Sequence, residues 1–146
     1  MAKPEVLNGL KQLLAESYTL YLKTHNYHWN VTGPMFTSLH TLFEVEYNEL
    51  ALAVDTIAER IRTLGDKAPA SYTAFAELSG IKEENGEPNA TAMIEQLVSD
   101  QAHIAATATA LLKAAAEAGD EATVSIATDR IEVHEKNAWM LRSHLE

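Results

Sequence analysis

Cysteine is absent from this sequence of 146 residues. Without a thiol, the chain can form neither a disulfide framework nor a thiolate zinc site, and it has no cysteine nucleophile. It also lacks a run of about 18 apolar residues, the length that a membrane-spanning helix needs. Its first residues do not resemble the apolar core of a signal peptide. We therefore expect a soluble, cytoplasmic protein that does not associate with membranes.

Basic residues are also scarce. Eleven Lys and Arg residues stand against 21 Asp and Glu residues, which gives a net charge of −10 and an isoelectric point near 5.0. Only Lys3 precedes the first expected helix, and Arg142 is the last basic residue before Glu146. Phosphate binding needs several clustered cations. We therefore do not expect DNA binding, and the acidic chain should instead attract cations.

The length and the composition fit a single domain over residues 1–146. Hydrophobic residues make up 47% of the chain and charged residues 22%, which is ordinary for a globular protein. Six glycines and four prolines leave few breaks, and between the breaks lie four long segments with apolar residues at helical spacing. The breaks lie at residues 33–34, 65–69, 80–89 and 119–120.

Capping signals support four long helices. Asn89 and Asp120 are suitable N-caps for the third and fourth helices, and Gly119 is a suitable residue to end the third. The connection over residues 65–89 contains a short apolar patch, formed by Tyr72, Phe75 and Leu78. This patch predicts a short helix that lies across the others. We expect an all-α four-helix bundle with a short helix in the connection between its second and third long helices.

Potential metal ligands lie at the end of the first expected helix and along the second: His28, His40, Glu44, Asp55 and Glu59. His40 and Glu44 are four residues apart, and so are Asp55 and Glu59, so each pair projects from one side of the helix. Glu44 and Asp55 point within about 20° of each other. The apolar stripe of the same helix points about 140° away, and it contains Leu39, Leu50 and Ile57.

The distance along this helix separates the two pairs. Eleven residues place Glu44 and Asp55 about 16 Å apart along the helix axis, too far for one metal centre. An antiparallel copy of the helix, related by a two-fold axis near residues 49–50, would bring His40 and Glu44 of one chain opposite Asp55 and Glu59 of the other. Such isologous contacts are the commonest oligomer interface. The spacing therefore favours a dimer with two shared sites.

Two imidazoles and three carboxylates suit Fe²⁺, Mn²⁺ or Zn²⁺, and the ligand types alone do not select iron. The residues leave an alternative open, in which the carboxylates are solvated charges on an exposed helix face and His40 is an ordinary surface residue. Ordinary ferritins carry Glu-x-x-His motifs inside the bundle. This sequence has none, and its nearest approach, Asp100-x-x-His103, lacks a partner motif. His134 and His144 are isolated, and we expect both on the surface.

Two stretches of the sequence resemble the signatures of a known family. The first is His28-Trp29-Asn30-Val31-Thr32-Gly33, followed by Leu39-His40 and Glu44. The second is Val54-Asp55-Thr56-Ile57-Ala58-Glu59-Arg60, followed by Leu64-Gly65 and Ala68. Together they resemble the Dps family, the mini-ferritins of the ferritin-like superfamily, also called DNA-binding proteins from starved cells. Glu44 stands where many members of that family carry Asp.

The resemblance implies a ferroxidase and an iron store that protects against oxidative damage. In the family, twelve bundles form a hollow shell through two-fold dimers, oxidise Fe²⁺ preferably with hydrogen peroxide, and keep the ferric mineral inside. By that resemblance, His28, His40, Glu44, Asp55 and Glu59 would bind two irons between subunits, and Trp29 would lie beside them. Zinc or another divalent metal could substitute for iron.

The resemblance also suggests a path for Fe²⁺ into the shell. Family members build acidic pores on a three-fold axis, and Asp120, Glu121 and Asp129 lie in the matching region. The alternative is that these acids favour the positive end of the helix dipole. Two other functions also stay open: DNA compaction, which the family name suggests, and a structural metal-bridged oligomer without turnover.

Overall fold

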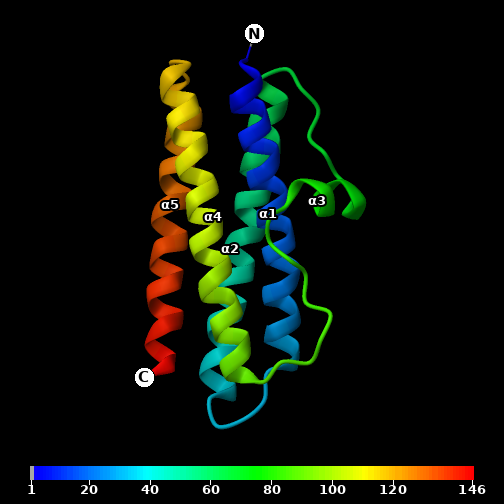
Figure 1. Cartoon of the computed structure of the whole chain (residues 1–146), viewed down its shortest axis with the longest axis vertical. Coiled ribbons are helices and arrows are strands. Elements are labelled where there is room, and N and C mark those ends of the chain that lie inside the picture. The colour runs from blue at the N-terminus through cyan, green and yellow to red at the C-terminus, as the bar shows by residue number, and fades with distance from the viewer. Residues whose placement is uncertain (1) are drawn as a thin grey trace.

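The computed structural model describes residues 2–146, and every regular element in that range is a helix. Four long helices lie side by side along the long axis of the molecule (Figure 1). They are α1 (Pro4–Asn30), α2 (Phe36–Thr63), α4 (Ala90–Glu117) and α5 (Glu121–Arg142). The short α3 (Tyr72–Leu78) packs against α1, and a 3₁₀ turn, η1 (Ser143–Leu145), follows α5. The predicted four-helix bundle with a short helix in its second connection is confirmed.

The helix ends follow the local signals in the sequence. The Asn89 side chain accepts a hydrogen bond of 2.9 Å from the backbone N–H of Ala92 at the start of α4. Asp120 accepts one of 3.1 Å from the N–H of Thr123 at the start of α5. Gly119 follows α4 with a φ of +71°, a left-handed conformation that favours glycine. All three expected caps are therefore present.

A short connection joins α1 to α2. It spans residues 31–35, and Gly33 adopts a φ of +107° within it, where a side chain would be strained. Val31 is buried at the beginning of this turn. Because the turn is so short, the last turn of α1 lies against the first turn of α2. This arrangement brings His28 and His40 into contact.

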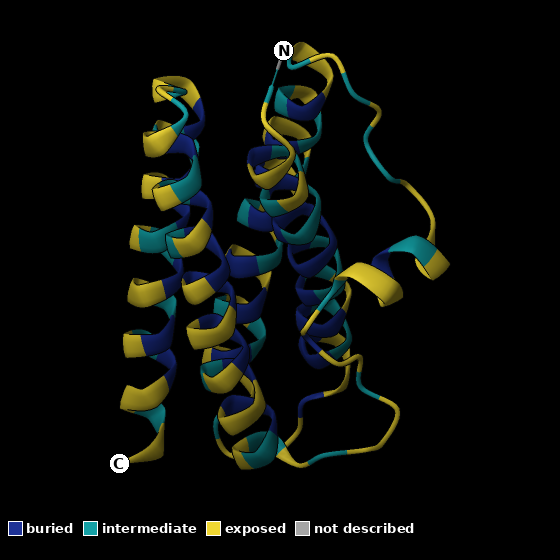
Figure 2. Cartoon of the chain, turned by 45° about the horizontal axis from the view of Figure 1, so that its top comes forward, coloured by how far each residue is buried: buried dark blue, intermediate teal, exposed yellow. Residues whose placement is uncertain are grey.

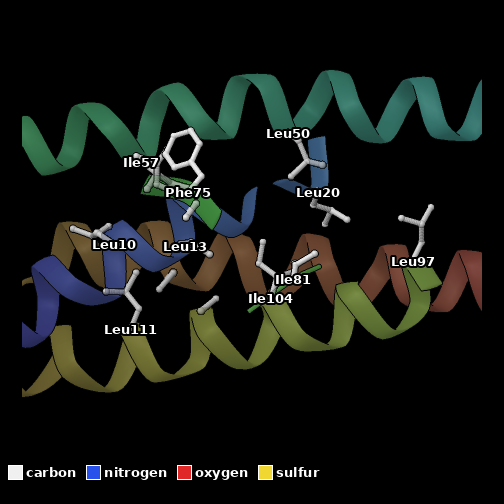
Figure 3. Close-up of a cluster of buried hydrophobic side chains, with 14 of the residues drawn as sticks. Leu10, Leu13, Leu20, Leu50, Ile57, Phe75, Ile81, Leu97, Ile104 and Leu111 are labelled. Carbon is white, nitrogen blue, oxygen red and sulfur yellow. The ribbon is translucent and has the colours of Figure 1, made fainter. Parts of the chain in front are cut away.

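The core runs the length of the bundle between the four long helices. Figure 3 shows leucine and isoleucine side chains from different helices that meet there, with Phe75 from α3 in the same cluster. The predicted apolar stripe of α2 is buried completely at Leu39, Leu50 and Ile57. Figure 2 shows the converse pattern, with exposed residues on the outward faces of the helices. No helix within residues 2–146 is long and apolar enough to cross a membrane.

His134 lies in the core, so the expectation of a surface histidine is wrong. Its Nδ1–H donates to Gln101 Oε1 at 2.6 Å, and its Nε2 accepts from an Nη2–H of Arg130 at 3.1 Å. Burial, and then the charge of Arg130, lower the pKa of His134 well below its ordinary value. Arg130 also forms a two-pronged ion pair with Glu49 of α2. This polar chain therefore ties α2, α4 and α5 together.

Glu46 of α2 is a second charged residue in the core. The residue is 2% exposed, and neither of its carboxylate oxygens has a hydrogen-bond partner among residues 2–146. Burial raises the pKa of Glu46 from 4.5 to about 8. A buried carboxyl without partners costs free energy whether it is neutral or charged, and the charged form costs more. Glu46 therefore destabilises the folded protein.

Replacing this side chain should stabilise the protein. Between pH 4.5 and about 8 the folded state keeps the Glu46 proton that the unfolded state releases, so stability falls as the pH rises through this window. Glu46→Leu should remove this decrease in stability, and it should raise the free energy of unfolding by about 3 kcal/mol near pH 8. Denaturant unfolding at the two ends of the window, at one fixed protein concentration, measures the effect. If the matched variant of exposed Glu95, Glu95→Leu, changes the pH dependence as much, Glu46 is not the cause.

Candidate metal centre

His28 and His40 hold each other in place across the α1–α2 turn. His28 Nδ1 lies 2.7 Å from the carbonyl oxygen of His40, and His40 Nδ1 lies 2.6 Å from the carbonyl oxygen of His28. A carbonyl oxygen only accepts, so each Nδ1 must carry the hydrogen. In the neutral form, each Nε2 then carries the lone pair that a metal needs. The reciprocal pair therefore fixes the tautomer of both candidate ligands.

Aromatic side chains enclose the two imidazoles. The rings of His28 and His40 stack with centroids 3.8 Å apart and an angle of 14° between their planes. Phe36 stacks on His40 at 5.0 Å, and Tyr47 presents its edge to His28 at 5.2 Å. His28 itself is buried. Contacts of this kind limit ring rotation, so the Nε2 atoms are held in position before any metal binds.

Glu44 completes the first group of candidate ligands. Its Oε1 lies 3.8 Å from His28 Nε2, too long for a hydrogen bond. The Glu44 side chain is about half exposed, so it can move. A carboxylate oxygen and an imidazole lone pair at this spacing can converge on one cation. We refer to His28, His40 and Glu44 as the histidine half of the site.

Asp55 and Glu59 form the second group, one turn apart and exposed on the same side of α2. A hydrogen bond with Asp55 and the charge of Asp55 raise the pKa of Glu59, because both favour its protonated form. A divalent cation would relieve the same repulsion without a proton. We refer to these two residues as the carboxylate half.

The structure does not bring the two halves together within one chain. Residues 2–146 contain no group of three or more His, Asp or Glu side chains arranged to hold a metal ion. The eleven residues between Glu44 and Asp55 separate the halves by about 16 Å along α2. Glu44, Asp55 and Glu59 are exposed on α2, away from Leu50 and Ile57, whereas His28 is buried at the end of α1.

Trp29 belongs to a row of aromatic side chains beside the histidine half. The Trp29 residue is 60% exposed, and its ring stacks on His25 at 3.8 Å. Tyr47 stacks on His25 at 4.1 Å. The sequence did not lead us to Phe36 as a neighbour of the site. The available signal was helical spacing, since Phe36 lies four residues before His40.

The three acids predicted for a pore have different surroundings. Asp120 caps α5 and also forms an ion pair of 2.7 Å with Arg60 of α2. Burial alone would raise the pKa of Asp120, but the hydrogen bonds from Thr123 and Arg60 outweigh it and lower the pKa. Asp129 lines a groove of about 380 Å³ between α2 and α5, and Glu121 is exposed. Asp120 therefore has a structural role that the other two do not share.

Asp100 and His103 contact other side chains within the bundle and do not form a pair of metal ligands with each other. Asp100 Oδ2 forms a 2.8 Å ion pair with Lys23 Nζ. His103 Nε2 lies 2.9 Å from Glu16 Oε2, which also accepts a hydrogen bond from the N–H of Gly80. The two residues thus tie α4 to α1 and to the connection that precedes α4.

Comparison with known proteins places this arrangement in a family. The ferritin-like domain family matches residues 7–146. The DNA protection during starvation protein of Brevibacillus brevis is 39% identical over 138 residues, which cover 94% of this chain and 92% of that protein. The crystal structure of a Dps protein from Bacillus brevis has a TM-score of 0.95 at 36% identity and covers 100% of both chains.

A more distant structure shows the same fold. The Dps protein from Vibrio cholerae, described as a member of a broad superfamily of ferritin-like diiron-carboxylate proteins, has a TM-score of 0.92 at 34% identity. The match covers 97% of this chain and 89% of that one. The fold and these matches define a ferritin-like protein. Within that class, the chain belongs to the Dps family of mini-ferritins, which confirms the resemblance seen in its motifs.

The role of Asp120 can be separated from that of its neighbour. Asp120→Ala should lower the free energy of unfolding by about 1–2 kcal/mol, because α5 loses its cap and Arg60 its partner. Glu121→Gln should change it by less than about 0.5 kcal/mol. Thermal unfolding of both variants checks the difference. Equal losses in the two variants would contradict a structural role for Asp120.

Proposed function

We propose that this protein is a ferroxidase and iron store whose metal sites form between subunits. The observation that supports the proposal best is the division of the candidate ligands into two separate groups. His28 at the end of α1 joins His40 and Glu44 of α2 in one group, and Asp55 and Glu59 of α2 form the other. Neither half alone has the ligands to hold two irons, and together they supply two imidazoles and three carboxylates. A two-fold partner with an antiparallel α2 would set the histidine half of one chain opposite the carboxylate half of the other.

The face that carries the ligands also has apolar side chains. Leu52 is 74% exposed and Val45 is 62% exposed, both on α2 beside the two halves. Large exposed apolar side chains in one region favour contact with another protein surface. We infer that a second copy covers this face, and that the dimers assemble further into a shell of twelve subunits, as the family resemblance implies.

Fe²⁺ is the substrate in this proposal, and hydrogen peroxide is the preferred oxidant. The Nε2 atoms of His28 and His40 and the carboxylates of Glu44, Asp55 and Glu59 would hold two Fe²⁺ ions. Each Fe²⁺ loses one electron, and the peroxide takes up both and becomes two hydroxide ions. Hard carboxylate oxygens favour Fe³⁺ over Fe²⁺, so the ligand set assists the oxidation. Two-electron reduction of peroxide releases no hydroxyl radical, which explains a protective role in the cytoplasm.

Storage would follow oxidation at these sites. Ferric ions would collect as a mineral inside the acidic shell, and Glu121 and Asp129 are candidates for the path by which Fe²⁺ enters. Zn²⁺ suits the same donors and would compete with iron. The alternative function is structural: the bound metal would bridge subunits without oxidation of iron.

Anaerobic loading tests the proposal directly. The purified assembly is titrated with Fe²⁺, peroxide is added, and ferric absorbance and retained iron per subunit are followed. A ferroxidase and store should oxidise two Fe²⁺ per site and retain many more irons on repeated addition. Binding without peroxide-driven oxidation would leave only the structural oligomer.

Mixing two inactive variants tests whether the sites are shared. His40→Ala removes a ligand from the histidine half, and Asp55→Ala removes one from the carboxylate half. Each variant alone should lose most Fe²⁺ oxidation. In a mixed dimer, one site receives both defects and the other receives two intact halves. Random mixing before assembly should therefore restore about a quarter of wild-type sites.

The control for mixing is a pair of variants in the same half, His28→Ala and His40→Ala, which should give no rescue. Sedimentation must show that every variant still forms the same assembly, which matters most for His28→Ala because His28 is buried at the α1–α2 turn. Absence of any rescue in assembled mixtures of His40→Ala and Asp55→Ala would contradict shared sites.

DNA binding should be absent. Each subunit carries a net charge of −10, and a shell multiplies this repulsion. Mobility-shift assays at physiological salt and neutral pH should show no retention of duplex DNA. Retention under those conditions without divalent cations would reveal a basic patch that the overall charge conceals, and would favour the DNA-compacting alternative.

A further inference from the structure

Asparagine directly precedes glycine at two places in the chain, at Asn8-Gly9 and at Asn85-Gly86. In this dipeptide the glycine nitrogen can attack the asparagine side chain, because glycine has no side chain of its own to obstruct the approach. Both asparagines are exposed, so solvent reaches the two side chains alike. Their backbones differ, and the first dipeptide therefore serves as an internal control for the second.

Asn8 and Gly9 lie inside α1. In a helix, the N–H of Gly9 is directed toward the carbonyl oxygen of the residue four positions earlier. A helical ψ of about −42° also keeps the asparagine side chain away from the following nitrogen. Gly9 packs closely on α4, since a Cβ there would lie 2.9 Å from a methyl carbon of Leu111. The backbone at Asn8 is therefore held in a conformation that prevents the attack.

Asn85 and Gly86 lie outside the helices, in the connection that joins α3 to α4. This connection runs outside the four long helices (Figure 1). Glu84 Oε2 accepts a hydrogen bond of 2.9 Å from the N–H of Gly86. The other oxygen of the same carboxylate accepts the hydroxyl hydrogen of Tyr27. Tyr27 thus holds a carboxylate against the nitrogen that can attack Asn85.

We propose that Asn85 is a site of spontaneous deamidation, in which Glu84 takes the proton of the attacking Gly86 nitrogen. That nitrogen bonds to the side-chain carbonyl carbon of Asn85, and the bond from this carbon to the amide nitrogen breaks. Ammonia leaves with the proton that Glu84 accepted, so the carboxylate is regenerated and a five-membered succinimide remains. Water then opens one of the two ring carbonyls, which gives aspartate or isoaspartate.

The products change the connection in charge and in length. A carboxylate replaces a neutral amide, so residues 83–87 carry four acidic side chains in place of three. Isoaspartate also adds a methylene group to the main chain between Glu84, which is bonded to α1, and Asn89, which caps α4. Charge repulsion and the longer path both weaken the attachment of the connection to α1. This inference is independent of the proposed ferroxidase function.

Peptide mapping by mass spectrometry tests the site. The purified assembly is kept at neutral pH, and samples taken over time are digested to follow the succinimide, aspartate and isoaspartate forms at both dipeptides. In the folded protein, Asn85 should convert many times faster than Asn8. In urea, where α1 is unfolded, the two asparagines should convert at similar rates. Equal rates in the folded assembly, or an equally large difference in urea, would overturn the proposal.

Two matched variants test Glu84 as the base. Glu84→Gln removes the proton acceptor beside the nitrogen and should slow the conversion of Asn85 several-fold. Glu83→Gln removes the same charge from the exposed neighbouring residue and should leave the rate unchanged. Asn8 must stay slow in both variants, which shows that α1 is still folded. An unchanged or faster rate in Glu84→Gln, or the same slowing in Glu83→Gln, contradicts the assignment of Glu84.

Discussion

The rotation of α2 about its own axis determines both the core and the candidate site. Burial of Leu39, Leu50 and Ile57 fixes that rotation, and each such side chain contributes about 1.5–3 kcal/mol. Glu44 and Asp55 lie on the other side of the same helix, so the packing that stabilises the bundle directs them outward. Turning them inward would lose the apolar burial and bury charges without partners. In the proposed site, these two carboxylates therefore meet their complement outside their own bundle.

This arrangement contrasts with bundles that bind metals between their own helices. In those proteins, the ligands project into the core and the bundle itself completes the site. Here the core carries other polar groups, the chain from Glu49 through Arg130 and His134 to Gln101, which are satisfied largely by one another. The bundle interior is thus already occupied, and the proposed carboxylate ligands lie on the exposed side of α2.

The α1–α2 turn holds the two candidate histidine ligands in fixed positions. The turn is short, so His28 and His40 can exchange hydrogen bonds with each other's backbone carbonyls. Those bonds fix both tautomers, and the aromatic neighbours restrict both rings. Glu44 remains about half exposed and free to adjust. In the proposed function, a rigid nitrogen pair beside the adjustable Glu44 carboxylate would suit the different ligand preferences of Fe²⁺ and Fe³⁺.

Local signals made much of the fold predictable from the sequence. Breaks, caps and apolar spacing depend on neighbouring residues, so Asn89, Gly119 and Asp120 were identified as helix ends, and the apolar patch around Phe75 as a short helix. Helical angles alone were enough to place Glu44, Asp55 and Glu59 away from the buried stripe of α2. The chemistry of the pairs indicated a metal, and the family motifs were needed to favour iron.

What could not be predicted depends on contacts between helices. Glu46 lies within about 20° of Leu39 on the helical wheel, so its position indicated burial while its charge indicated solvent. His134 lies four residues from buried Arg130 and from buried Ala138, but α5 has too few large apolar residues to mark its inner side. The Arg60 pair of Asp120 joins residues 60 positions apart, and no local pattern reveals it.

The central claim is that each metal site draws on two subunits. Anomalous diffraction from crystals of the Zn²⁺- or Fe²⁺-loaded assembly tests it most directly, because it locates the metal and its ligands together. The account predicts metal about 2.0–2.2 Å from an Nε2 of the histidine half of one subunit and from a carboxylate oxygen of Asp55 or Glu59 of its two-fold partner. Metal bound entirely by residues of one chain would contradict it.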